Sequence, residues 1–263
     1  MADELVGLGP LVVIFAALFG AMFGSFLNVC ILRLPADQSV VRPPSRCPSC
    51  GKGVAWYDNV PVLSWLALRG RCRHCGAPIS MQYPLVELAT AALWALAFWR
   101  LGPTLEALRA AVFGTILLGI AMTDAREYII PDEFTWGGLA IGLLFSLAGG
   151  LAGLGHAVLG AAVGFGLLWA FGALGTWMLK QDAMGGGDVK MMAMVGAFLG
   201  WQGVPVTVFL GALIGSLIYA PLALFGRKRL VPFGVFLALG AAATYVAGPA
   251  IYAWYMGALW GPA

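Results

Sequence analysis

Two aspartates lie where long apolar segments of this chain end, and their positions suit acid–base chemistry. Asp124 closes one such segment, and Asp188 opens another after three glycines. An acidic side chain at the edge of a bilayer is costly, so each position needs a reason. Two carboxyl groups in a partly dehydrated site hold one proton between them, so that one can activate water while the other donates to a peptide carbonyl. The pair therefore predicts aspartic peptidase chemistry.

The glycine run before Asp188 is the second feature of this site. Residues without a Cβ allow a substrate backbone to approach the aspartate, and they allow a helix to start irregularly at membrane depth. We therefore expect Gly185, Gly187 and Lys190 to support the active site. The alternative is that Asp188 is a helix cap and Asp124 an interfacial charge. Two acids on one membrane face, one of them in a GxGD sequence, favour catalysis.

Asp132 has two interpretations. It follows Pro131, and a proline followed by an acid suits the first turn of a helix, where the helix dipole favours a negative charge. The other interpretation is a supporting role in the active site. The sequence slightly favours capping.

Four of the five cysteines form two Cys-x2-Cys pairs separated by 21 residues, which is close to the spacing of a ribbon-type zinc site. Each pair is followed by a glycine, Gly51 or Gly76, which permits the tight turn that directs sulfurs at an ion. Disulfides are the alternative, but they need an oxidising compartment. A closed four-sulfur site has no open position for water, so the metal is expected to be structural. The predicted ligands are Cys47, Cys50, Cys72 and Cys75.

The composition places the chain in a bilayer. Apolar residues make up 61% of it and charged residues only 10%, whereas soluble domains carry about a quarter charged residues. Apolar segments that could cross about 30 Å of hydrocarbon recur along the chain. They predict an all-α polytopic membrane protein of about eight helices, over 7–32, 85–101, 105–123, 134–152, 156–179, 187–201, 204–225 and 231–258.

The distribution of basic residues supports this count and sets the orientation. If the N-terminus faces outward, the connections after the first, third, fifth and seventh helices are cytoplasmic and should be rich in Lys and Arg. All of the 15 basic residues except Arg100 and Arg109 fall in or beside those connections. Both aspartates then lie at the cytoplasmic face, and the cysteines lie in the cytosol, where thiols stay reduced.

The segment between the first two helices differs from the rest in its Pro, Gly, Cys and Arg content. We therefore predict a first transmembrane helix over 1–32, a cytoplasmic tetracysteine module over 33–84 and a transmembrane peptidase core over 85–263. The basic residues of the module fit the positive-inside bias, so nucleic acid is not an expected partner. The lipid bilayer is an expected partner. The sequence predicts no oligomeric state.

Other peptidase chemistries lack their residues. The chain has two histidines and no HExxH sequence, which argues against an intramembrane metalloprotease. A rhomboid-type serine peptidase needs a serine nucleophile with a histidine partner. His156 is predicted at the membrane face opposite the aspartates, with no such serine near it in the sequence.

Short motifs recur along nearly the whole chain. They are Gly24 to Val29, Arg33 to Pro35, Asp58 to Pro61, Ser64 to Leu66, Leu68 to Cys72, Ile79 with Ser80, Tyr83 to Glu87, Asp124 with Pro131 and Asp132, and Met184 to Lys190. Together with the two cysteine pairs, they resemble the motifs of bacterial type IV prepilin peptidases. Members of that family are bifunctional leader peptidases and N-methyltransferases of the GxGD aspartic class.

The resemblance implies that Asp124 and Asp188 are the catalytic pair. It implies cleavage of prepilin and pseudopilin leaders after the terminal glycine, at the cytoplasmic face of the bacterial inner membrane. It also implies methylation of the new amino terminus with S-adenosylmethionine as the methyl donor. The candidates for methyl transfer are Asn28, Asp58, Arg69, Arg71 and Glu87. For Glu87, a capping charge or a ligand of the cysteine module's site is an equal alternative.

One residue departs from the family pattern. Val235 stands where a second proline is expected in the stretch Pro232 to Phe236, which could soften the start of the last helix without abolishing activity. Two other functions remain open at this stage. One is an intramembrane peptidase of the presenilin or signal-peptide-peptidase kind, a group that lacks the tetracysteine insert. The other is a transporter or assembly scaffold whose acids relay protons.

Overall fold

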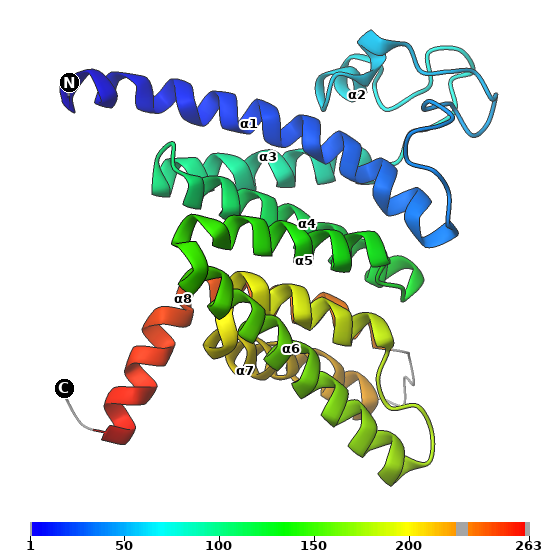
Figure 1. Ribbon diagram of the computed structural model, residues 1–263. Helices are drawn as coiled ribbons and strands as arrows, with labels where there is room; N and C mark the ends of the chain where they lie inside the picture. Colours follow the sequence, from blue (N-terminus) through cyan, green and yellow to red (C-terminus); the bar gives the residue numbers. More distant parts are fainter. Residues whose placement is uncertain (1, 225–230, 261–263) are drawn as a thin grey trace. The chain divides into compact units, whose positions relative to one another are not determined.

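The computed structural model describes residues 2–224 and 231–260, and these are helical as predicted, with no strand among them (Figure 1). Contacts divide the chain into two compact units, residues 1–115 and 116–263. Helix α4 runs from the first unit into the second. The long helices are α1 (Ala2–Arg33), α3 (Gln82–Leu101), α4 (Leu105–Glu127), α5 (Asp132–Ser146), α6 (Gly150–Leu179), α7 (Gly186–Leu224) and α8 (Phe233–Trp260).

Five stretches of the described chain are long and apolar enough to cross a membrane. They are Gly9–Ala36, Gln82–Leu101, Leu105–Glu127, Asp132–Leu179 and Gly186–Tyr219. The fourth of them joins α5 to α6 through the short 3-10 helix η3 (Leu147–Gly149), and the fifth is part of α7, which is broken at Gly200 with a φ of 70°. The eight predicted segments thus correspond to α1, α3, α4, α5, α6, the two halves of α7, and α8. Their number of membrane crossings stays a prediction, and the basic connection at 227–229 lies outside the described residues.

In the first unit, α1 packs along α3 through small residues. A Cβ added to Gly24 would lie 2.7 Å from the Cα of Glu87, so the two backbones touch at this level. The ring of Trp94 stacks on Phe23 at 4.9 Å between centroids, and its indole nitrogen donates to the Thr115 hydroxyl at 3.0 Å. The close packing of α1 on α3 encloses buried polar side chains between the two helices.

The insert between α1 and α3 has almost no buried interior. It contains η1 (Leu34–Ala36), η2 (Trp56–Asn59) and α2 (Leu63–Ala67), and Gly70 is its only fully buried residue between positions 34 and 81. A module of this size that lacks an apolar core needs another source of stability, such as a bound metal.

Helix α7 forms the core of the second unit, where it packs against α5, α6 and α8. Among the described residues its first turns are the most buried, because Met191, Met192, Met194 and Val195 have no exposed surface. Helix α6 lies beside it (Figure 1). At their crossing, a Cβ on Gly160 would collide with the carbonyl oxygen of Gly196, and a Cβ on Gly196 would collide with that of Gly160.

Candidate active site and metal centre

Asp124 lies in the last turn of α4 and is only 6% exposed. Its Oδ2 accepts a hydrogen bond from the backbone N–H of Val235 at 3.0 Å. Val235 is in the first turn of α8, where backbone amides have no partner within the helix. The start of α8 therefore orients this carboxylate and provides a donor for its negative charge.

Gly234 brings the start of α8 against Asp124. A Cβ at this position would lie 2.9 Å from the Oδ2 of Asp124 and 2.7 Å from the Cδ1 of Ile130. Real Cβ atoms essentially never make such contacts, so a glycine is required if the carboxylate keeps its place. At Val235, where the family pattern has a proline, this chain provides the donor to Asp124. Valine has an amide hydrogen that a proline would lack.

Asp188 lies in the first turn of α7, immediately before the buried core of that helix. Its Oδ1 is enclosed and has no hydrogen-bond partner among the residues that the structure describes. A Cβ on Gly185 would lie 3.1 Å from the Oδ2 of Asp188, so this glycine leaves open the approach to the carboxyl group.

Ile130 packs against a glycine beside each of the two aspartates. It follows α4, and a Cβ on Gly187 would lie 3.0 Å from its Cβ, while a Cβ on Gly234 would lie 2.7 Å from its Cδ1. One apolar side chain thus packs against the glycine beside Asp188 and against the glycine that contacts Asp124. Neither Ile130 nor Gly234 could be predicted as a site residue from the sequence, because these contacts join residues that are far apart in the chain.

Asp132 and Lys190 form an ion pair in the same unit. The Nζ of Lys190 lies 2.7 and 2.9 Å from the two carboxylate oxygens of Asp132. Asp132 is in the first turn of α5, and the N-cap residue of that helix is Pro131. The pair therefore connects the start of α5 to the start of α7, two residues after Asp188.

The two cysteine pairs form near-identical turns. In the first, the N–H of Gly51 donates to the carbonyl of Cys47, and in the second the N–H of Gly76 donates to that of Cys72. The glycines have φ values of 71° and 72°, a conformation that residues with a Cβ rarely adopt. This is the role that the sequence predicted for both glycines.

The four thiols point at a common centre. Their sulfurs all lie within 4.8 Å of one another, and those of Cys47 and Cys75 are 3.8 Å apart. A tetrahedral ion with metal–sulfur bonds of about 2.3 Å separates its ligands by about 3.8 Å, so the cluster could hold zinc. The cysteines are unbridged, which argues against disulfides. Backbone N–H groups of Cys50 and Ser49 lower the pKa of the Cys47 thiol to about 6, whereas desolvation and the other three thiols raise the pKa of Cys75 to about 11, so in the absence of a metal the thiolate is favoured at Cys47 and not at Cys75.

Replacing Cys72 with serine is expected to remove most of the bound zinc and to loosen the insert, because three thiolates remain and no apolar core compensates. The measurement is zinc content by elemental analysis together with limited proteolysis of residues 34–81. Cys30→Ser is the matched control, since Cys30 lies buried in α1 away from the two turns. Equal zinc in the wild type and the Cys72 variant would contradict the prediction.

The candidates for methyl transfer fall into two groups. Asn28 and Glu87 are buried at the contact of α1 and α3. The Oδ1 of Asn28 has no partner among the described residues, although its Nδ2 donates to the carbonyls of Gly24 and Tyr83. Glu87 accepts a hydrogen bond from the N–H of Val62 at 2.7 Å. It lies beyond the first turn of α3, so it does not cap that helix and instead holds the insert.

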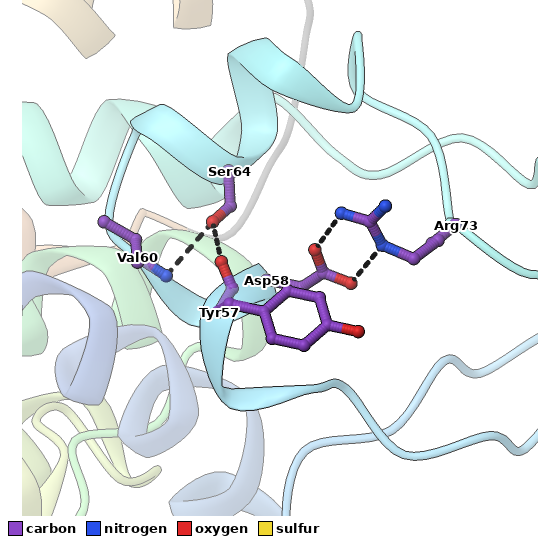
Figure 2. Close-up of polar contacts among 5 residues, drawn as sticks. All are labelled: Tyr57, Asp58, Val60, Ser64 and Arg73. Carbon is purple, nitrogen blue, oxygen red and sulfur yellow. Dashed lines mark hydrogen bonds and ion pairs between the residues drawn. The ribbon is translucent and has the colours of Figure 1, made fainter.

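The other candidates belong to the insert. Asp58 pairs with Arg73 through two hydrogen bonds, at 2.5 and 2.8 Å (Figure 2). The Arg73 guanidinium holds the pKa of this carboxyl below its usual value. Arg69 has a φ of 52°, and Arg71 forms a backbone bridge with Pro78 beside the second cysteine pair. Sequence reasoning had not identified Arg73 as the partner of Asp58, because arginines are numerous in this segment.

Residues 18–101 match the bacterial peptidase A24 N-terminal domain, and residues 111–220 match the type IV leader peptidase family. The chain is 44% identical over 212 residues to a prepilin leader peptidase/N-methyltransferase of Myxococcus xanthus, covering 81% of this chain and 61% of that protein. Enzymes of the same description from Aeromonas hydrophila and Neisseria gonorrhoeae are 38% and 33% identical. They cover 91% and 95% of this chain and 92% and 96% of their own lengths. No solved structure matches.

Proposed function

The chain belongs to the type IV leader peptidase family, and from that premise we propose that it cleaves the leaders of prepilins and pseudopilins and N-methylates the new amino terminus. The observation that carries the peptidase is the pair Asp124 and Asp188. The two residues are 64 positions apart in the sequence, yet Gly187, which precedes Asp188, and Gly234, which contacts Asp124, both pack against Ile130. The long apolar helices and the family indicate a multi-pass protein of the inner membrane.

In this proposal the two aspartates have different tasks. Asp124 accepts an amide hydrogen bond at the start of α8, so it is the charged member and takes a proton from water. The resulting hydroxide attacks the carbonyl carbon of the peptide bond after the leader's last residue. The carboxyl group of Asp188, approached past Gly185, donates a proton to the carbonyl oxygen. Collapse of the tetrahedral species breaks the C–N bond, the proton held by Asp124 passes to the departing amine, and one hydroxyl proton of the tetrahedral species returns to Asp188.

Supporting residues keep this pair in place. The ion pair of Asp132 and Lys190 fixes the start of α7, and Gly185 and Gly187 leave room for the substrate backbone. We place this site at the cytoplasmic face, with the N-terminus in the periplasm. The basic residues beside the predicted cytoplasmic connections and the unbridged thiols support that orientation.

For the insert, we propose structural zinc at the four cysteines and a part in methyl transfer for residues 33–84, beside a peptidase core over 85–263. S-adenosylmethionine supplies a methyl group carried on a positively charged sulfur. Two buried acceptors, the Glu87 carboxylate and the unpartnered Oδ1 of Asn28, suit a cationic group, so we assign these residues to the methyl donor.

The proposal is tested with the purified enzyme in nanodiscs and a full-length prepilin. Mass spectrometry should show loss of the leader. Addition of S-adenosylmethionine should then add the mass of one methylene to the shortened pilin. An intact prepilin after prolonged incubation would contradict the peptidase, and a cleaved but unmodified product would contradict only the methyltransferase.

Replacing Glu87 with glutamine is expected to weaken methylation about tenfold, because one charged acceptor is lost. Glutamine keeps an oxygen for the Val62 amide, so the insert should remain attached and leader cleavage should be unchanged. The measurement is the Kd for S-adenosylmethionine by calorimetry alongside the methylation rate. Glu106→Gln, in the first turn of α4, is the control. Wild-type affinity in the Glu87 variant would exclude this residue from the donor site.

A further inference from the structure

The short helix α2 of the insert presents apolar side chains that nothing in its own unit covers. Leu63 and Leu66 are 65% and 58% exposed, and they share one face of the helix because they are three residues apart. Trp56, in the preceding η2, is 83% exposed. In a module surrounded by water, such residues are expected to be buried. A group of exposed apolar side chains indicates a contact surface.

The exposure is not the result of a loose segment. The hydroxyl of Ser64 accepts the N–H of Val60 at 3.1 Å and donates to the carbonyl of Tyr57 at 3.0 Å, so it joins η2 to α2 (Figure 2). The same figure shows the paired hydrogen bonds between Asp58 and Arg73, which fix η2 to the second cysteine turn. The framework therefore holds these apolar side chains outward.

The position of α2 along the membrane helices indicates what covers it. Val62, immediately before α2, donates its N–H to Glu87, and Glu87 touches Gly24 of α1. Glu87 is five residues inside α3 and Gly24 is nine residues from the end of α1, which correspond to about 8 and about 14 Å along the helices. The start of α2 thus lies beside α1 and α3, at a level inside their ends and not beyond them.

The excess of basic residues in the insert favours an anionic lipid as the partner. Residues 33–84 contain seven Lys and Arg and two acids, Asp37 and Asp58. Basic residues beside an apolar surface that contains tryptophan are the combination that binds the headgroup region of anionic membranes. A soluble acidic partner would explain the charge but not the depth of α2.

We propose that the face of α2 formed by Leu63 and Leu66, together with Trp56, is a membrane-surface contact that lies in the boundary between headgroups and acyl chains of an anionic bilayer. The insert is then fixed against the membrane at three places, which are the end of α1, the start of α3 and this face. The inference depends on the fold of the first unit and is independent of the proposed peptidase activity.

Hydrogen–deuterium exchange of the full-length protein tests this proposal in nanodiscs of phosphatidylglycerol and, separately, of phosphatidylcholine. In phosphatidylglycerol, amides of residues 60–68 should exchange about tenfold faster in Leu63→Lys than in the wild type, because the charge expels this face from the acyl boundary. Val41→Lys is the matched control, since Val41 is a similarly exposed apolar residue of the insert outside α2. Its exchange over 60–68 should equal that of the wild type, and protection should be weaker in phosphatidylcholine.

Zinc content and thermal stability of both variants establish that the insert remains folded. Equal exchange over 60–68 in the wild type and in folded Leu63→Lys would overturn the proposal. Protection that appears only after a prepilin is added would also overturn it, because the occupant of this face would then be the substrate and not lipid.

Discussion

Leader cleavage is expected to fall at least about a thousandfold when either Asp124 or Asp188 is replaced with asparagine, because general acid–base steps by a positioned side chain contribute about 10² to 10⁴ in rate. Asparagine has nearly the same shape as aspartate but cannot take up or release a proton at neutral pH. The fold should therefore persist while the proton transfers to and from water are lost. The measurement is the rate of cleavage of a purified prepilin in nanodiscs.

Asp182→Asn is the control for this pair, because Asp182 is an exposed acid in the connection that precedes α7. It should retain the wild-type rate. Both catalytic variants should still methylate a pilin that has already lost its leader, since the donor residues are assigned to the first unit. Normal cleavage by both variants would exclude an aspartic mechanism for this protein.

A single added methyl group at position 234 is expected to have the next largest effect. In Gly234→Ala the new Cβ would lie 2.9 Å from the Oδ2 of Asp124 and 2.7 Å from Ile130. Either α8 or the carboxylate must move, and a displacement of about 1 Å in a catalytic group can cost about a hundredfold in rate. We expect kcat to fall while KM changes little, because the substrate is bound by other parts of the site.

Gly257→Ala is the matched control for the substitution at 234. Gly257 lies in the same helix, and a Cβ there would meet nothing within 4 Å. It should leave cleavage unchanged, and thermal unfolding of both variants separates a loss of stability from a loss of catalysis. A Gly234→Ala enzyme with wild-type kcat would show that the start of α8 does not position Asp124.

Features set by local spacing could be predicted from the sequence. The turns at Cys47 and Cys72 depend on residues within five positions of each other, and the helix segments depend on the apolar composition of each stretch. Element boundaries were less accurate. The segment expected over 134–152 ends as an α-helix at Ser146, and α6 already begins at Gly150, which has a φ of 66° and marks the change of direction.

Contacts between distant parts of the chain could not be predicted in this way. Val235 donates to a carboxylate 111 residues earlier, and Lys190 pairs with an acid 58 residues earlier. The sequence drew attention to the stretch around Val235 only as a departure from a motif. Nothing in its composition indicates that its backbone amide meets Asp124, because a backbone donor exists at every residue except proline.

The crossing of α6 and α7 has a consequence for catalysis at a distance. The backbones of the two helices are in direct contact at Gly160 and Gly196. Gly196 is eight residues, or about 12 Å, from Asp188 along α7. This contact fixes the position of α7 against α6. A bulkier residue at either glycine would collide with the facing backbone, and we expect it to displace α7 and with it Asp188 in the first turn of that helix.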